Sequence, residues 1–183
     1  LNLFMSISKL KNSLSKTESI SFPPVHLWDP ELCEGQSISI NREGTWFYNN
    51  SEIKNIKLVN LFSTVLRKDN DKYFLVTPTE KVPVEVEIAP YLITNFELLD
   101  DKTIRLDTNL NYSFNLNSLN TTRLFEIEGM LMPIVHVRNN IEGFFNRSTY
   151  YKLVDLALNS SIINNDILHI KSDNVDHPIG KIA

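Results

Sequence analysis

Residues 57–61 (KLVNL) and 152–156 (KLVDL) are almost the same sequence, and the two stretches begin 95 positions apart. The first belongs to a longer run with apolar residues at Leu58, Leu61, Phe62 and Val65, the spacing of a helix with one buried face. At the same offset of 95, Asn70-Asp71 falls on Asn165-Asp166 without a gap. These matches predict an internal duplication.

Strands flank both helices at matching positions, which extends the repeat. Residues 73–75 (YFL) fall on 168–170 (LHI), and Ile40 falls on Val135. Two related modules packed into one molecule would explain the gap-free match of strand, helix, turn and strand. The alternative is convergent patterning between two similar β-helix-β units.

The remaining patterns complete an α+β fold of two related β-rich modules, each with a packed helix. In the first module, the β-rich runs at 37–40 and 45–48 predict a hairpin, and residues 73–77 and 82–88 predict strands. Arg67-Lys68 is a basic pair that suits the C-terminus of the helix. In the second, we expect a helix at 148–158 and strands at 91–99, 103–107, 110–116, 133–138 and 166–171. Residues 117–129 suggest a loop or edge, and the tail from about 172 looks loose.

These patterns predict three segments. We expect an N-terminal helix and tail at 1–22, with Ile7, Leu10 and Leu14 at helical spacing, the first module at 23–88 and the second at 89–183. Three apolar positions give a helix little energy for membrane insertion, so we expect it to lie on a protein surface.

Composition narrows the classes of function. The net charge is -4 and the isoelectric point is near 5.6, which argues against nucleic acid as a partner. The single cysteine, Cys33, excludes a disulfide framework within the chain and suits a cytoplasmic location. Because the histidines are scattered and there is one cysteine, we expect no metal centre. Five glycines leave no glycine-rich phosphate loop, and no motif implies a cofactor. No apolar run is long enough to span a membrane.

Basic, aromatic and carboxylate side chains near the predicted strand and helix ends form the candidate site. Arginine binds carboxylates and phosphates with two parallel hydrogen bonds, tryptophan offers a stacking face, and a helix start offers free N–H groups. We expect ligand-binding roles for Arg42, Trp46, Glu80, Lys81, His136, Arg138, Glu142, Asn146 and Arg147. The alternative is that these residues pair with one another, Arg147 with Glu142 for example, and hold the modules together.

Several of these segments resemble the bacterial domain-of-unknown-function family 1285. The resemblance rests on residues 23–30 (PPVHLWDP), 44–48 (GTWFY) and 73–82 (YFLVTPTEKV), and in the second half on Val137-Arg138, Ile141-Glu142, Asn146-Arg147 and 151–154 (YKLV). It covers about residues 23 to 172. Asp29 stands where many members have Asn, and residues 109–120 have no counterpart.

The resemblance implies a duplicated α+β core, a C-terminal half superficially like a pleckstrin-homology barrel, and a cleft between the halves. The family has no established activity, and a nucleotide-like ligand and a signalling role have been suggested for it. We therefore expect a cytoplasmic ligand-binding or signalling module that binds a small anionic molecule between its halves. The alternatives are a pleckstrin-like protein-interaction domain without a small ligand, and, last, a hydrolase with Glu80 or His136 as base, which no nucleophile or metal set supports.

Overall fold

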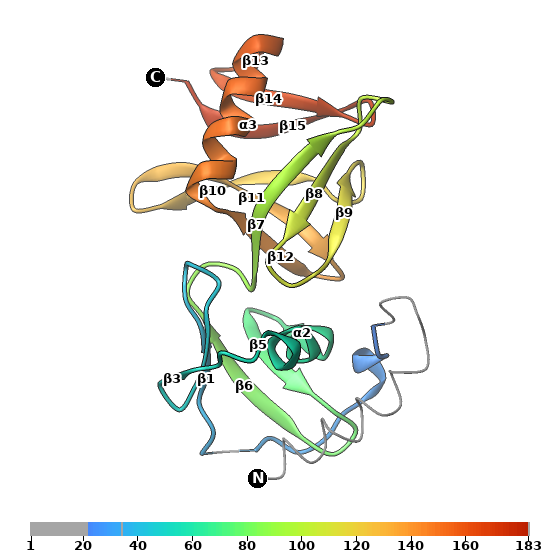
Figure 1. The fold of residues 1–183 in the computed structure, drawn as a ribbon, viewed down its shortest axis with the longest axis vertical. Helices are drawn as coiled ribbons and strands as arrows, with labels where there is room; N and C mark the ends of the chain where they lie inside the picture. Colours follow the sequence, from blue (N-terminus) through green and yellow to red (C-terminus); the bar gives the residue numbers. More distant parts are fainter. Residues whose placement is uncertain (1–21, 34, 183) are drawn as a thin grey trace. The chain divides into compact units, whose positions relative to one another are not determined.

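The computed structural model describes residues 22–33 and 35–182, and the chain divides into two compact units, Leu1–Glu87 and Ile88–Ala183. Each unit is β-rich and carries an α-helix, so the predicted α+β class is confirmed (Figure 1). The helix predicted near the N-terminus lies outside the described residues.

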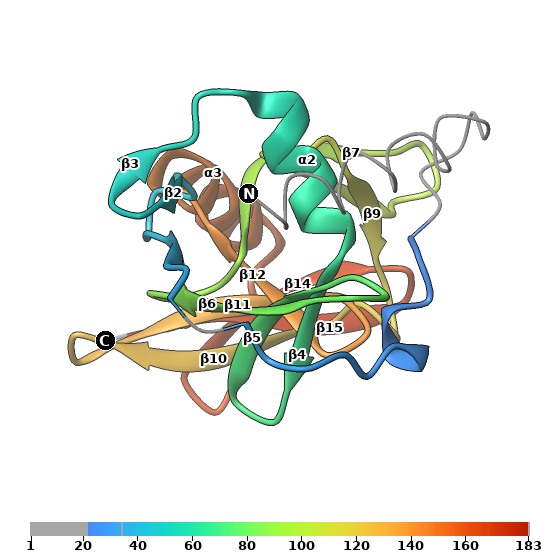
Figure 2. The same cartoon turned by 90° about the horizontal axis from the view of Figure 1, so that it is seen from below.

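The N-terminal unit is a six-stranded sheet with one helix on its face. After a short 3-10 turn, η1 (Val25–Leu27), its elements are β1 (Ile38–Ile40), β2 (Trp46–Tyr48), β3 (Ser51–Glu52), α2 (Ile56–Thr64), β4 (Leu66–Asp69), β5 (Lys72–Val76) and β6 (Lys81–Val86). The strand order is β3-β2-β1-β6-β5-β4, with β1 and β6 parallel. Figure 2 shows α2 lying over β4, β5 and β6.

Buried side chains on neighbouring strands form the core between this sheet and α2. Leu66, Leu75 and Val82 sit at paired positions on neighbouring strands, and all three side chains are buried. Phe62, which is fully buried on α2, completes this core. The side-chain oxygen of Asn55 caps the helix by accepting hydrogen bonds from Lys57 N and Leu58 N.

The C-terminal unit contains a curled six-stranded half-barrel sheet and a separate three-stranded sheet (Figure 1). The first sheet has the order β10-β11-β12-β7-β8-β9, and the second β13-β14-β15. Helix α3 lies against β7, β14 and β15. The elements are β7 (Tyr91–Leu98), β8 (Ile104–Thr108), β9 (Ser113–Leu116), β10 (Thr122–Ile127), β11 (Met130–Arg138), β12 (Ile141–Phe145), α3 (Arg147–Ser160), β13 (Ile162–Asn164), β14 (Ile167–Ser172) and β15 (Val175–Lys181).

The predicted duplication is confirmed down to the pairing of individual residues. The series β1-β2-α2-β4-β5-β6 corresponds to β11-β12-α3-β13-β14-β15 in type and order. Phe74 faces Pro83 across β5 and β6, and the residues 95 places later, His169 and Pro178, face each other across β14 and β15. Convergent patterning of two unrelated units would not preserve this register.

Two sequence predictions are wrong. Arg67 lies in β4 and does not end a helix, because α2 stops at Thr64 and Val65 leads directly into the strand. The tail from 172 is not loose: β15 pairs along its length with β14, and His177 and Ile179 are fully buried. The strand was hidden because Asp176, Pro178 and Gly180 are residues that usually weaken strands.

Asparagine occupies many of the tight turns of this glycine-poor chain. Among the described non-glycine residues, twelve have a positive φ, and seven of them are Asn49, Asn50, Asn70, Asn111, Asn139, Asn165 and Asn174. Asparagine tolerates this left-handed conformation better than other side chains do. Lys102 also adopts the left-handed conformation, with a φ of 66°, although a lysine side chain does not tolerate this conformation as asparagine does.

Candidate functional site

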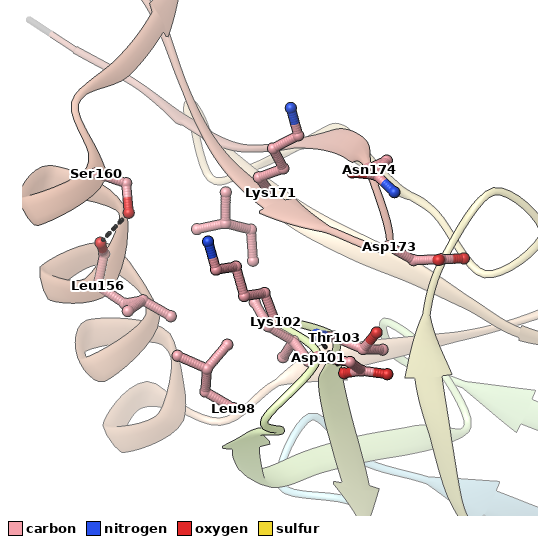
Figure 3. Close-up of a pocket in the computed structure, with 11 residues that line it drawn as sticks. Leu98, Asp101, Lys102, Thr103, Leu156, Ser160, Lys171, Asp173 and Asn174 are labelled. Carbon is pink, nitrogen blue, oxygen red and sulfur yellow. Dashed lines mark hydrogen bonds between the residues drawn. The ribbon is translucent and has the colours of Figure 1, made fainter.

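A groove of about 610 Å³ opens on the C-terminal unit, where three segments that are distant in sequence meet. One wall is the C-terminal part of α3, the second is the turn between β7 and β8, and the third is the end of β14 with its turn into β15 (Figure 3). The lining residues are Leu98, Asp101, Lys102, Thr103, Ile104, Leu156, Ser160, Ile170, Lys171, Asp173 and Asn174.

The apolar part of the groove is aliphatic. Ile104 and Ile170 are each 1% exposed and belong to the core beneath it. Leu98 is 52% exposed, and Leu156 on α3 is half-buried. Figure 3 shows Leu98 and Leu156 on the same side of Lys102. A leucine that remains this exposed beside a hollow offers a surface on which an apolar group can bury itself.

Two lysines supply positive charge to the groove. In Figure 3 the side chain of Lys102 extends toward α3, and Lys171 stands on the neighbouring strand β14. Both lysines are exposed, and neither ammonium group forms a salt bridge with any described acidic residue. The left-handed backbone at Lys102 costs roughly 1 kcal/mol relative to glycine.

Two aspartates lie on the side of the groove away from α3, as Figure 3 shows. Asp101 accepts a hydrogen bond of 2.9 Å from the backbone N–H of Thr103, which closes the turn between β7 and β8. Asp173 and Asn174 form the turn between β14 and β15. The charges are therefore separated along the groove, with a lysine on the α3 side and carboxylates on the other.

Hydrogen bonds hold two of the groove walls together. Ser172 Oγ accepts from Ile104 N at 2.8 Å and donates to the carbonyl oxygen of Leu116 at 2.5 Å. Since Ser172 is fully buried, this link joins β14 to β8 and β9 inside the core. The positions of Lys102 and Lys171 follow from this rigid support.

The residues that the sequence predicted as a site in the N-terminal unit lie at separate places. Arg42 forms a salt bridge of 2.8 Å with Glu87 just beyond the end of β6, whereas Lys81 stands at the start of that strand. Six residues of extended chain separate Lys81 from Glu87, about 20 Å at ~3.3 Å per residue. Lys81 Nζ lies 2.7 Å from Asp69 Oδ2 and 4.2 Å from the centroid of the Phe74 ring.

Trp46 and Glu80 are both buried in the N-terminal unit. Trp46 is 1% exposed and its ring packs 6.3 Å from that of Phe62, so its indole belongs to the core. Glu80 is 8% exposed, and its Oε2 has no hydrogen-bond partner among the described residues. Stacking of Trp46 on a ligand would require this core to open.

In the C-terminal unit, the structure brings His136 and Glu142 together as opposite residues of β11 and β12. Glu142 accepts two hydrogen bonds from Arg123, at 2.6 and 2.9 Å, so the predicted pairing of Glu142 with Arg147 is wrong. His136 Nε2–H donates to the carbonyl oxygen of Asn139. Arg123 was not among the predicted residues, although it lies on β10, the strand that pairs with the His136 strand β11.

Arg138, Asn146 and Arg147 have contacts of their own. Arg138 is 8% exposed, and its Nε donates a hydrogen bond of 3.1 Å to the Tyr91 hydroxyl. Asn146 is the N-cap of α3, since its Oδ1 accepts from Thr149 N at 2.7 Å. The Arg147 guanidinium lies over the ring of Tyr151, 5.5 Å from its centroid. A ligand-binding role for these residues stays a prediction.

The sequence contained no signal that could have found the groove. Lys102 follows two aspartates in a turn, and Lys171 alternates outward on a strand, both ordinary solvent-facing patterns. The packing of β14 against β8 and β9, which the Ser172 hydrogen bonds join, places both lysines in the lining of one groove. Within the described part of the chain, no group of three or more His, Cys, Asp or Glu residues could hold a metal ion.

Comparisons with known proteins agree with the two-unit architecture. The family model "Domain of unknown function (DUF1285), N-terminal domain" matches residues 23–89, and the family model "Protein of unknown function (DUF1285), C-terminal domain" matches residues 90–179. The chain belongs to the DUF1285 family. The two DUF1285 matches together span most of the sequence and meet close to the boundary between the structural units.

Solved structures of DUF1285 proteins share this fold. A DUF1285 family protein from Silicibacter pomeroyi DSS-3 is 30% identical, with a TM-score of 0.81 and coverage of 93% of both chains. One from Shewanella baltica OS155 is 28% identical, with a TM-score of 0.56, and covers 67% of this chain and 94% of its own. Among curated proteins, no relative matches. The family resemblance and the α+β fold with a curled half-barrel in the C-terminal half are thus confirmed, and both solved proteins are described only as DUF1285 family proteins.

Proposed function

We propose that this protein is a cytoplasmic ligand-binding module that binds a small anionic molecule in the groove of its C-terminal unit. The observation that carries the proposal is the pair Lys102 and Lys171, two exposed lysines at a concave site without a salt bridge to any described acidic residue. A cation that has no salt-bridge partner within the protein can pair with an anion from solution without first breaking an existing ion pair.

Three of the four basic residues expected from the sequence support this choice by contrast. Arg42 and Lys81 already lie against carboxylates at 2.8 and 2.7 Å, and Arg138 is buried against Tyr91. An anion would have to displace those partners, and each displacement would reduce the net gain in binding energy. The expectation placed the ligand between the two halves; the groove that supports the proposal belongs to the C-terminal unit alone.

The composition of the groove favours binding over catalysis. The eleven described residues that line it include no histidine or cysteine, and the hydroxyl of Ser160 donates to the carbonyl oxygen of Leu156 at 3.1 Å. A nucleophile needs a base within hydrogen-bond reach, and none of the lining residues supplies one to Ser160. The lone cysteine supports the cytoplasmic location. Within the described chain, no helix could span a membrane. We extend the proposal to a signalling role, which rests on the family resemblance alone.

A protein-interaction domain is the second candidate, and the hairpin of β10 and β11 favours it. Phe125, Met130 and Leu131 on this hairpin are 43%, 59% and 38% exposed, and β10 is an edge strand of its sheet. Exposed apolar side chains next to unpaired strand edges are features of docking surfaces.

A thermal-shift screen of the full chain tests the proposed function. The probes are AMP, pyrophosphate and octanoate, each at millimolar concentration, with sodium chloride at matched ionic strength as the blank. We expect at least one anion to raise the melting temperature, and Lys102→Gln to remove that shift. Lys152→Gln is the matched control, because Lys152 is an exposed lysine on α3 outside the groove. No stabilisation by any probe, or equal loss in both variants, would overturn the proposal.

A further inference from the structure

Given the proposed function, on which this step rests, the groove also indicates the chemical class of its ligand. We infer that the groove binds an aliphatic monocarboxylate of medium chain length, with the carboxylate at the lysines and the alkyl chain on the leucines. Three features of the groove lead to this class: the kind of apolar surface, the arrangement of charge, and the volume.

The apolar surface fits an alkyl chain better than a nucleobase. None of the described residues that line the groove is aromatic. Proteins usually hold a base by stacking it on an aromatic ring or a guanidinium, and the lining has no arginine either. Leu98 and Leu156, with Ile104 and Ile170 beneath, offer branched aliphatic groups instead. Each methylene of a ligand that is buried against them adds to the binding free energy.

The arrangement of charge fits a single anionic group. Lys102 extends toward α3, on the side of the groove where Leu98 and Leu156 lie, while Asp101 and Asp173 lie on the other side (Figure 3). A di- or triphosphate in the groove would bring negative charge close to these two carboxylates, and like charges repel. One carboxylate can pair with a lysine and leave the acidic side to solvent. The ammonium of lysine is a compact charge that needs no bidentate partner.

The volume of the groove is large enough for an alkyl chain of medium length. The groove holds about 610 Å³, within the range of about 300 to 1,000 Å³ that is usual for small-molecule sites. The exposed leucines lie beside Lys102, so a chain attached to a carboxylate at Lys102 meets them at once. Octanoate is therefore a suitable probe.

Isothermal titration calorimetry on the full chain tests the class of ligand with four probes. Octanoate and octylammonium have the same chain and opposite charge, while AMP and pyrophosphate are anions without an alkyl chain. We expect octanoate to bind and the other three to bind at least about tenfold more weakly, the change that ~1.4 kcal/mol produces. Equal affinity for octanoate and octylammonium would overturn the inference, because the lysines would then play no part.

Matched variants assign the binding to the two sides of the groove. Lys102→Gln should weaken octanoate binding about tenfold, since a hydrogen bond to a charged group is lost, and Lys152→Gln should leave it unchanged. Leu156→Asn should weaken binding, whereas Leu158→Asn should not, because Leu158 is a 51% exposed leucine on α3 outside the groove. Equal effects within either pair would overturn the placement.

The outcomes separate this inference from the proposed function. If AMP or pyrophosphate binds through Lys102 and octanoate does not, the protein is still an anion-binding module and the aliphatic class is wrong. If no anion binds, both fall together. If octanoate binds with the expected dependence on Lys102 and Leu156, both stand.

Discussion

Replacement of Trp46 by alanine should strongly destabilise the N-terminal unit. The side chain is 1% exposed and packs on Phe62. A buried tryptophan removes about 150–250 Å² from water, which at ~25 cal/mol per Å² corresponds to about 4–6 kcal/mol. Tryptophan-to-alanine changes in protein cores cost about 3–5 kcal/mol, so we expect a loss of about 4 kcal/mol in the free energy of unfolding.

Urea denaturation followed by fluorescence and circular dichroism measures this loss. The chain has two tryptophans, Trp28 and Trp46, and both belong to the N-terminal unit. In the variant, Trp28 alone reports the unfolding of that unit, while circular dichroism reports both units. The fluorescence transition should move to lower urea.

Two further substitutions of this strand make the prediction sharper. Trp46→Phe keeps an aromatic ring and removes an indole N–H that has no hydrogen-bond partner among the described residues. It should therefore cost only about 1–2 kcal/mol. Phe47→Ala, next in the strand and only half-buried, should cost less than Trp46→Ala. If Trp46→Ala changes stability by less than about 1 kcal/mol, Trp46 is not a core residue and a ligand-stacking role regains its place.

Two other predictions concern the C-terminal unit. Asn146→Ala removes the cap of α3 and should lower the free energy of unfolding by about 1 kcal/mol in urea denaturation. Asn159→Ala changes an exposed position of the same helix and should not lower it. Equal stability of the two variants would refute the role of Asn146 as a cap. Burial lowers the pKa of His177 below its ordinary value of 6.5, an effect that the nearby Asp173 and Asp176 oppose and His169 reinforces. The unfolded chain therefore binds this proton more readily, and stability should fall as pH drops from 6.5 to the lower folded pKa. His177→Gln should reduce that dependence, and the exposed His26→Gln should not; identical pH profiles in all three proteins would contradict the assignment.

Much of the fold could be predicted from the sequence, because local patterns and the final packing agree there. The hairpin of β1 and β2, the helix near Leu58 and the strand that is β6 in the structure could all be predicted from the pattern of apolar and polar residues. The duplication was visible because the repeat kept its spacing through the turns. The sequence did not predict β12, because its central Gly143 is untypical of a strand. Glycine suits this position because the Cβ atom of any other residue would lie only 3.0 Å from Val137 Cγ2.

The candidate site could not be predicted, because its residues acquire their meaning only from tertiary packing. The nine predicted residues were chosen for chemical type near element ends, and the structure gives most of them structural partners, such as Glu87 for Arg42 and Asp69 for Lys81. Lys102 and Lys171 are chemically ordinary in the sequence. They differ from the predicted residues Arg42 and Lys81 in having a groove beside them and no salt-bridge partner among the described residues.

The shared register of the two modules also creates a problem for folding. Since β5 and β14 pair with their partners through equivalent residues, β5 could also meet β15 during folding and form a misassembled sheet. Closing the native β5–β6 hairpin brings together residues a few positions apart, whereas the crossed pair spans about 100 residues, a difference of roughly 3 kcal/mol in loop-closure free energy. The irregularity in register at Leu168, which the first hairpin lacks, adds a further mismatch to the crossed pair. The divergence between the two copies therefore allows each strand to select its own partner.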